Sequence, residues 1–324
     1  MEIFEAVETY IDRKRSLGVT FEKAALNLRS FSKRVGDVPL ETITPRQILT
    51  FLNGPRTSTV TWRVKYNLLK HFFEYWAARG MLPAPPMPVI RPPVPRTFVP
   101  YIYSRNEVRV LLRTARESQK LATCSIDSAT LRIFLVFLYA TGVLVGEALG
   151  LLREDVDLKN GVITIRASRF NRSRIIPVGP DLQTKLRRYV TRFGRRRMLC
   201  PHFFLDKRGK AVSCHTLRAT FQKLRRLAGI RRHDGAIYQP RMHDLRYTFA
   251  VHRLTSWFKQ GADMNRLLPA LAAYIGQVGL GSTERYLSMT PERFRGQLVL
   301  LSPQRTKKKR WRDNAALMRF LAEL

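Results

Sequence analysis

Prolines are concentrated in one short stretch of this chain of 324 residues. Eight of the 18 prolines lie within residues 81–100. Proline lacks a backbone N–H and restricts its own φ, so a segment this rich in proline resists both a helix and a central strand. The stretch therefore predicts an extended linker. The chain is long enough for one large or two ordinary domains, and the linker divides it into a short first part and a long second part.

Residues 1–80 are predicted to form a small helical domain. Ile3, Val7 and Ile11 recur at helical spacing, which places them on one apolar face. Thr44 and Gln47 have the spacing of a capping box, which begins another helix. A last helix is expected over residues 58–78, with an apolar face formed by Val60, Tyr66, Leu69, Phe73 and Trp76.

Basic side chains outnumber acidic ones by a wide margin. The chain has 58 lysines and arginines against 24 acidic residues, a formal net charge of +34. Residues 1–85 carry 13 basic and 8 acidic side chains, whereas residues 86–324 carry 45 and 16. Because so large a charge repels itself unless a polyanion neutralises it, nucleic acid is the first candidate partner. A ribosomal or heparin-like partner is the alternative.

Three basic residues lie on the polar face of the helix expected over residues 58–78. They are Arg63, Lys65 and Lys70. In a chain this basic, such a face predicts a helix that lies against DNA. A solvated face of an ordinary amphipathic helix explains the same pattern equally well.

The second part is predicted to be mostly helical with a small antiparallel β element, an α+β fold over residues 101–303. A capping box at Ser104 and Glu107 begins it, and the apolar run over residues 131–141 predicts a buried helix. Short β-branched segments at 162–165 and 175–178 predict two strands joined by a basic hairpin. Further helices are expected at 181–193, 216–227, 243–257, 267–275 and 291–301.

Residues 304–324 are predicted to form a basic tail. A charge run at residues 307–312 precedes an apolar stripe at helical spacing, formed by Ala315, Leu317, Met318, Phe320 and Leu321. The run alone is typical of a solvated tail. The stripe after it indicates a helix that docks, and a neighbouring subunit is one candidate for the surface it docks onto.

Composition also indicates the compartment. No apolar run reaches membrane length, and the acidic start is unlike a secretory signal. The three cysteines do not make a disulfide framework, so we expect a bacterial cytoplasmic protein without membrane partners. Cys200 with His202, and Cys214 with His215, could be drawn as four zinc ligands. Their spacing matches no common zinc finger, so we expect no metal and ordinary buried or loop residues.

Three residue types in the second half suit work on a phosphodiester. His243 and Arg246 are three positions apart, which puts an imidazole and a guanidinium on one helix face. Tyr286 follows in a basic segment. A guanidinium can grip a phosphate oxygen with two hydrogen bonds, an imidazole can take or share a proton near neutral pH, and a tyrosine oxygen can attack phosphorus. For Tyr286, a half-buried structural tyrosine is the alternative.

The order of short motifs resembles that of the tyrosine recombinases, the phage-integrase family. The resemblance covers nearly all of the chain, and each motif alone is weak. The matching segments are YATG at 139–142 with GEAL at 146–149, the hairpin at 169–177, HDLRYTFA at 243–250, YIGQ at 274–277 and STERYL at 282–287.

This resemblance implies a mechanism and a partner. It implies that residues 1–80 are a core-binding domain on DNA, and that Tyr286 attacks a DNA phosphate to form a 3′-phosphotyrosyl bond. The freed 5′-hydroxyl later attacks the partner strand. Because the phosphotyrosyl bond conserves the energy of the broken one, no cofactor, metal or nucleotide is needed. Four protomers, identical or related, are expected to hold two double-stranded DNA segments.

Three positions depart from the family pattern. Leu144 stands where the family has an arginine, two residues before Gly146. Arg169 aligns with the lysine of the hairpin, which is the usual general acid, and arginine holds its proton too tightly for that role. Gln277, nine residues before Tyr286, replaces a histidine or tryptophan and can still donate a hydrogen bond.

These departures leave two hypotheses open. In the first, the protein is a working recombinase of a mobile element, and Arg172 or Arg174 supplies the missing positive charge. In the second, it is a DNA-binding subunit or decayed relative that has lost strand cleavage. Leu144 favours the second hypothesis. The retained tyrosine, arginine and histidine favour the first.

Overall fold

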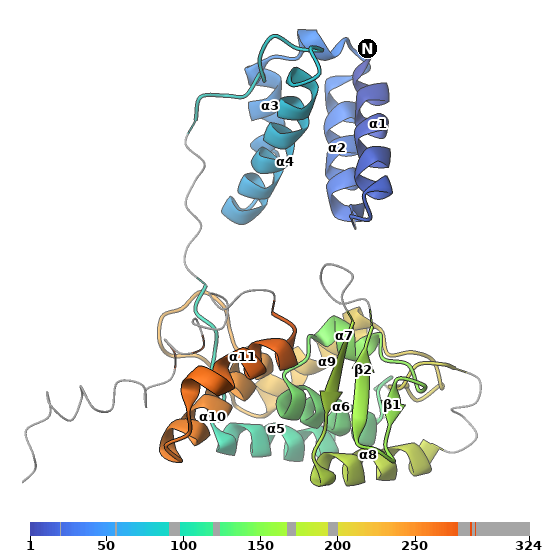
Figure 1. The fold of residues 1–324 in the computed structure, drawn as a ribbon, viewed down its shortest axis with the longest axis vertical. Helices are drawn as coiled ribbons and strands as arrows, with labels where there is room; N and C mark the ends of the chain where they lie inside the picture. Colours follow the sequence, from blue (N-terminus) through green and yellow to red (C-terminus); the bar gives the residue numbers. More distant parts are fainter. Residues whose placement is uncertain are drawn as a thin grey trace, which may run out of the picture. The chain divides into compact units, whose positions relative to one another are not determined.

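The computed structural model describes most of the chain in two compact units, Met1–Thr97 and Phe98–Leu324 (Figure 1). The residues it describes are 1–19, 21–55, 57–90, 98–118, 124–166, 173–193, 200–277, 286 and 289. The predictions for the hairpin tip, for a helix at 291–301 and for the tail at 304–324 fall outside the described residues.

The first unit is helical, as its apolar periodicity predicts. Its elements are α1 (Ile3–Ser16), α2 (Glu22–Val35), a 3-10 turn (Leu40–Thr42), α3 (Pro45–Leu52) and α4 (Thr59–Ala77). Thr44 and Gln47 form the expected capping box at the start of α3. α2 was not predicted from the sequence, and Val60 is 51% exposed rather than part of the apolar face of α4.

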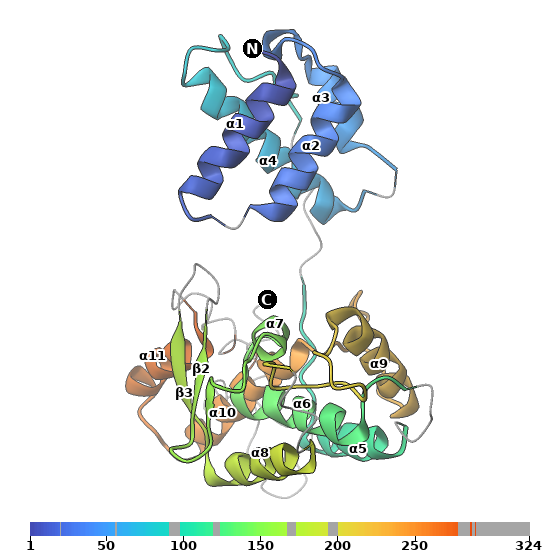
Figure 2. The same cartoon turned by 90° about the vertical axis from the view of Figure 1, so that its right-hand side faces the viewer.

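The second unit is built around one buried helix. Its helices are α5 (Arg105–Ser118), α6 (Ser128–Thr141), α7 (Val145–Leu149), α8 (Pro180–Phe193), α9 (Cys214–Leu227), α10 (Asp244–Lys259) and α11 (Met264–Ile275). α6 contacts α5, α7, α8 and α10 (Figure 2). This helix is the predicted apolar run. Ser104 and Glu107 make the expected reciprocal hydrogen bonds of 2.7 and 3.1 Å before α5.

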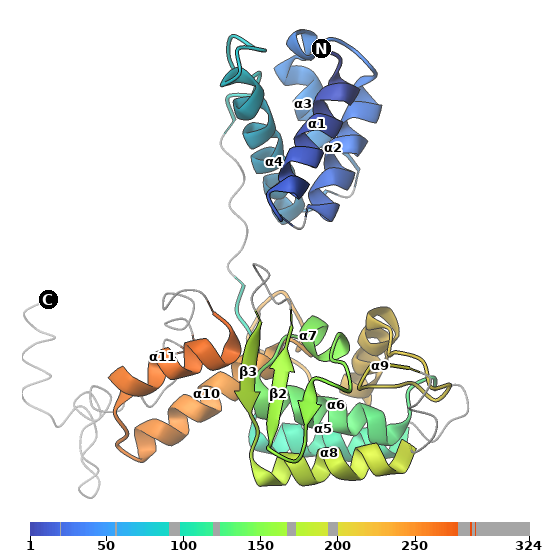
Figure 3. The same ribbon diagram turned by 45° about the vertical axis from the view of Figure 1, so that its right-hand side comes forward.

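A small antiparallel sheet of three strands lies beside these helices (Figure 3). Its order is β1 (Val156–Asp157), β2 (Val162–Ile165) and β3 (Arg174–Pro177). Pro177 pairs with Val162 on the edge strand β3, where a missing N–H is tolerated. The two-residue β1 was not predicted, because it is too short to carry an alternating pattern. The mostly helical α+β fold was predicted and is confirmed.

Candidate functional site

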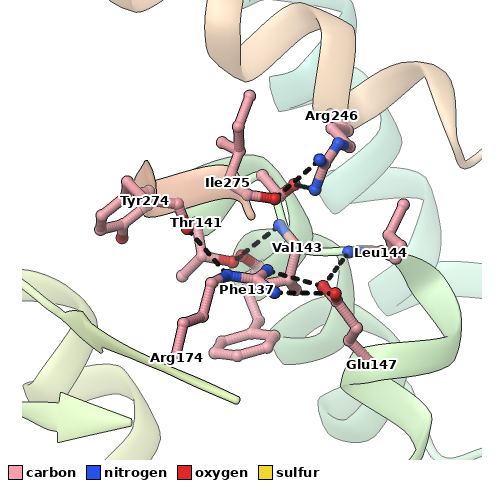
Figure 4. Close-up of polar contacts among 10 residues, drawn as sticks. Phe137, Thr141, Val143, Leu144, Glu147, Arg174, Arg246, Tyr274 and Ile275 are labelled. Carbon is pink, nitrogen blue, oxygen red and sulfur yellow. Dashed lines mark hydrogen bonds and ion pairs between the residues drawn. The ribbon is translucent and has the colours of Figure 1, made fainter. Parts of the chain in front are cut away.

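Arg246 lies in the first turn of α10 and is held by two backbone carbonyls from other elements (Figure 4). Its Nη1 donates to the Gly142 carbonyl at 2.8 Å, and its Nη2 donates to the Ile275 carbonyl at 2.7 Å. The residue is only 7% exposed. These bonds fix the guanidinium at the point where the end of α6, the start of α10 and the end of α11 meet.

Gly142 makes this approach possible. It ends α6 in the left-handed conformation, with φ of 63°, so its carbonyl leaves the helix and faces Arg246. A Cβ at this position would overlap the ring of Phe249 on α10. Glycine is therefore required both by its backbone angle and by the close packing of α10.

Tyr286 is buried beside Arg246's helix. It is 2% exposed and belongs to an apolar cluster with Phe249 of α10 and Ile275 of α11. Its hydroxyl accepts a hydrogen bond of 3.0 Å from Nε2 of Gln277, which follows directly after the cap of α11. The predicted pair of Gln277 and Tyr286 is thus in contact, and the phenol oxygen has a fixed donor.

The ring of Tyr247 lies between the imidazole of His243 and the phenol of Tyr286, and Tyr247 was not among the predicted site residues. His243 precedes α10 as its cap residue, and its ring centroid lies 6.0 Å from that of Tyr247. The Tyr247 ring is 5.3 Å from the Tyr286 ring. Tyr247 therefore contacts both predicted site residues. Its place four residues after His243, one turn along the same helix face, was the available signal.

The position of the expected arginine is occupied by Leu144, just before α7. Its backbone N–H donates to Oε2 of Glu147 at 2.8 Å. The same carboxylate accepts from Nη1 and Nη2 of Arg174 at 2.9 and 2.8 Å. The Arg174 and Glu147 side chains are 12% and 6% exposed. Arg174 is thus the internal ion-pair partner of Glu147, and its contact with DNA stays a prediction.

Arg174 and Arg246 both bind the end of α11. Nε of Arg174 donates to the Tyr274 carbonyl at 3.0 Å, one residue before the carbonyl that Arg246 binds. Gly276 follows with φ of 72°, and a Cβ there would meet the Arg174 guanidinium. Two cations therefore lie at the negative end of a helix dipole, and they fix the segment that leads to Gln277.

Arg174→Ala is expected to destabilise the protein by about 3–5 kcal/mol, because it leaves the Glu147 carboxylate buried without its cation. Chemical denaturation followed by circular dichroism measures this. Arg188→Ala, at an exposed position on α8, is the matched control and should change the free energy of unfolding by less than about 0.5 kcal/mol. Equal effects of the two variants would contradict a structural role for the Arg174–Glu147 pair.

The other residues predicted to contact DNA lie on α4 or outside the described residues. On α4, Arg63 and Lys70 are exposed, and Lys70 pairs with Glu74 at 3.7 Å. Nζ of Lys65 lies 4.4 Å from the centre of the Phe51 ring. Arg169 and Arg172 lie outside the described residues, so their roles stay predictions.

Two other expectations concern metals and membranes. Cys200 Sγ lies 3.7 Å from His202 Nδ1, but the described residues contain no group of three or more histidine, cysteine or acidic side chains arranged to hold a metal. Every helix within the described ranges is too short or too polar to span a bilayer.

The order of the sequence motifs and the mostly helical fold with its small antiparallel sheet are those of a tyrosine recombinase. The sequence matches the phage integrase family over residues 104–290, more than half of the chain. The chain therefore belongs to that family, as its motifs predicted.

Related sequences and solved structures are similar to this chain over most of its length. The y4rE protein of Sinorhizobium fredii (strain NBRC 101917 / NGR234), whose name designates it an integrase/recombinase, is 34% identical over 297 residues, 88% of this chain and 91% of that protein. Tyrosine recombinase XerC of Staphylococcus aureus (strain MSSA476) is 25% identical over 93% of this chain and 91% of its own length. The lambda integrase dimer bound to a COC′ core site shares the fold, with a TM-score of 0.63, 19% identity, and coverage of 86% of this chain and 96% of the other.

Proposed function

We propose that this protein is a site-specific DNA recombinase or integrase of a mobile element, which acts through a 3′-phosphotyrosyl DNA intermediate. The observation that carries the proposal is the meeting of Arg246, Gln277 and Tyr286 at the end of α11. Arg246 binds the carbonyl of Ile275, two residues before Gln277, and Gln277 binds the phenol of Tyr286, so the three groups gather at one helix end. This set of groups can bind a phosphate and attack it.

Each residue then has a role that follows from its chemistry. Tyr286 is the nucleophile, and Gln277 holds its oxygen by a hydrogen bond that can pass to a phosphate oxygen. Arg246 binds the phosphate, since its guanidinium has N–H groups beyond the two that reach carbonyls. His243 takes or shares a proton. Arg169 stabilises the leaving oxygen by charge, without easily protonating it.

Leu144 gives a second candidate function specific support. A leucine cannot bind a phosphate oxygen, and removal of one fixed donor from a developing anion costs about 2.7–4 kcal/mol, on the order of a hundred- to a thousandfold in rate. Arg174, the described arginine proposed to compensate, binds Glu147 instead. The protein would then be a DNA-binding subunit with impaired cleavage, which acts beside an active relative.

In both functions, the partner is double-stranded DNA and the working assembly is a tetramer of identical or related protomers in the bacterial cytoplasm. The excess of 45 basic over 16 acidic side chains in residues 86–324 supports binding to phosphates. Residues 1–80 are proposed as the core-binding domain, with Arg63, Lys65 and Lys70 on DNA. The lambda integrase, solved as a tetramer bound to a Holliday junction, is an example of such an assembly (TM-score 0.62, 18% identity, 86% and 78% coverage).

The test uses nicked suicide duplexes made from the junctions of the DNA element that encodes the protein. The expected result is a gel shift that weakens steeply with salt, together with a small amount of covalent adduct. Mass spectrometry of the digested adduct should place the DNA on residue 286. Binding without any adduct would support the subunit function, and absence of DNA binding would contradict both.

A further inference from the structure

The exposed side of α5 is a row of arginines. Its members, at spacings of four, four and three, are Arg105, Arg109, Arg113 and Arg116. These spacings place them on one helix face, while Val108, Leu111 and Ala115 are buried on the other. We refer to the four arginines as the α5 row.

The α5 row is poorly balanced by negative charge. No salt bridge to any of its members is found among the residues that the structure describes. Like charges at i and i+4 destabilise a helix, so an anion bound along the row would relieve this repulsion. Glu117, also exposed, stands at the C-terminal end of α5 and is a single charge against four.

A second row lies on α8. Its members, Lys185, Arg188 and Arg192, follow at spacings of three and four and are exposed, whereas Leu182, Leu186 and Tyr189 are buried. We refer to the three cations as the α8 row. Only Arg192 has an acidic neighbour within salt-bridge range in the described part of the chain, Asp127 at 3.8 Å.

α6 lies between the two rows and belongs to the same surface. It contacts both α5 and α8, and its Arg132 is exposed. Val136 and Ala140 of α6 line a cavity of about 500 Å³ together with Lys185 and Asp181 of α8. The α5 row, the α8 row and Arg132 are together called the far basic face.

The electrostatics of Tyr139 on α6 support this grouping. Burial raises the pKa of the Tyr139 phenol, and the positive charges of Arg105, Arg253 and Arg109 oppose the rise. Charges from α5 and from Arg253 on α10 therefore act on the same half-buried side chain of α6. Arg253 also lines the cavity beside Lys185, which links the two ends of the face.

This face is on the opposite edge of its unit from α7. α5 and α8 run along the lower edge of the second unit in all three ribbon views, and α7 lies at its upper edge (Figures 1, 2 and 3). Leu144 caps α7 beside the proposed phosphate site. A DNA backbone bound at that site therefore leaves the far basic face uncovered.

We propose that the far basic face binds a second DNA duplex, separate from the one that reaches Tyr286. Helices pack about 8–10 Å apart, so the axes of α5 and α8, which both contact α6, are within about 16–20 Å of each other. The major groove of DNA is about 12 Å wide, and the two strands that border it can lie along such rows. Arginine suits this role because its planar guanidinium binds phosphate oxygens in pairs.

Native mass spectrometry of the full-length Tyr286→Phe protein tests the proposal, because that variant is not expected to cleave DNA. The probe is a duplex of arbitrary sequence and about 16 bp, roughly one and a half turns, which has room for one protomer at the first site. We expect two duplexes per monomer. Adding Arg113→Glu and Arg188→Glu should reduce this to one and lower the salt dependence of the weaker binding step by about one unit per arginine.

Lys259→Glu with Arg266→Glu is the matched control, since it changes the net charge equally at exposed positions of α10 and α11. The control should still bind two duplexes. A single duplex on the Tyr286→Phe protein, or equal losses in both double variants, would overturn the proposal. So would competition for the face by an acidic polypeptide, polyglutamate, at lower concentrations than DNA. None of these outcomes depends on strand cleavage, so the proposed function is tested separately.

Discussion

Tyr286→Phe is expected to yield no covalent protein–DNA adduct on nicked suicide duplexes, while DNA binding and folding remain intact. The substitution removes one oxygen atom, the nucleophile of the proposed reaction. The ring itself is 2% exposed and packs in an apolar cluster with Phe249 and Ile275, and phenylalanine preserves that packing. The hydrogen bond from Gln277 is lost, at a cost of about 0.5–1.5 kcal/mol in stability.

Tyr247→Phe is the matched control for this prediction. The Tyr247 ring lies 5.3 Å from the Tyr286 ring and belongs to the same helix as Arg246, so loss of its hydroxyl alters the same neighbourhood. Adduct formation should persist in the control. The measurement is the amount of labelled DNA that migrates with the protein on denaturing gels. An adduct that survives in Tyr286→Phe would assign the nucleophile to another residue.

Much of the fold follows from local patterns in the sequence. The capping boxes at Thr44 and Ser104 and the apolar run that becomes α6 were predicted because their signals lie within a few residues of each other. The strand β1 and the helix α2 were not predicted. β1 is two residues long and exists by pairing with β2. α2 buries Ala25, Leu28 and Phe31, which recur at helical spacing, so its signal was present in the sequence and was not used.

The residues of the candidate site stay a prediction, and their hydrogen bonds could not be predicted from the sequence. Motif order named Arg246, Gln277 and Tyr286, and the structure brings them to the end of α11. No local pattern shows that Arg174 binds Glu147, because the two are 27 residues apart and meet through sheet and helix packing. For the same reason, the carbonyls of Tyr274 and Ile275 were not recognised as the anchors of two arginines.

The Arg174–Glu147 pair explains how this site remains ordered without an arginine at position 144. Glu147 also accepts from the Leu144 N–H, so its carboxylate joins α7 to Arg174 of β3, and Arg174 in turn donates to the end of α11. Burial raises the pKa of Tyr274, and the Arg253 and Arg174 charges oppose that rise, which agrees with Arg174 lying against α11. Among the described residues, these bonds order the surroundings of the proposed phosphate site, and position 144 adds no cation to it.

Leu144→Arg is therefore expected to raise the rate of adduct formation by about a hundred- to a thousandfold, the effect of one fixed donor at a developing anion. Leu144 is partly exposed and stands beside Glu147, near the guanidinium of Arg246 (Figure 4). An arginine there starts from a backbone position that the Glu147 carboxylate already fixes. Its side chain can then add a second guanidinium to the phosphate site.

Gly146→Arg is the control, because it adds the same charge to α7 at an exposed position where a side chain meets only open space. It should strengthen DNA binding slightly and leave the rate of adduct formation nearly unchanged. Single-turnover kinetics with saturating protein separate the two effects. If the wild type already forms adduct rapidly, and Leu144→Arg adds nothing, another group supplies the missing charge. The impaired-subunit function would then be wrong, and Arg169 and Arg172 would be the first residues to test.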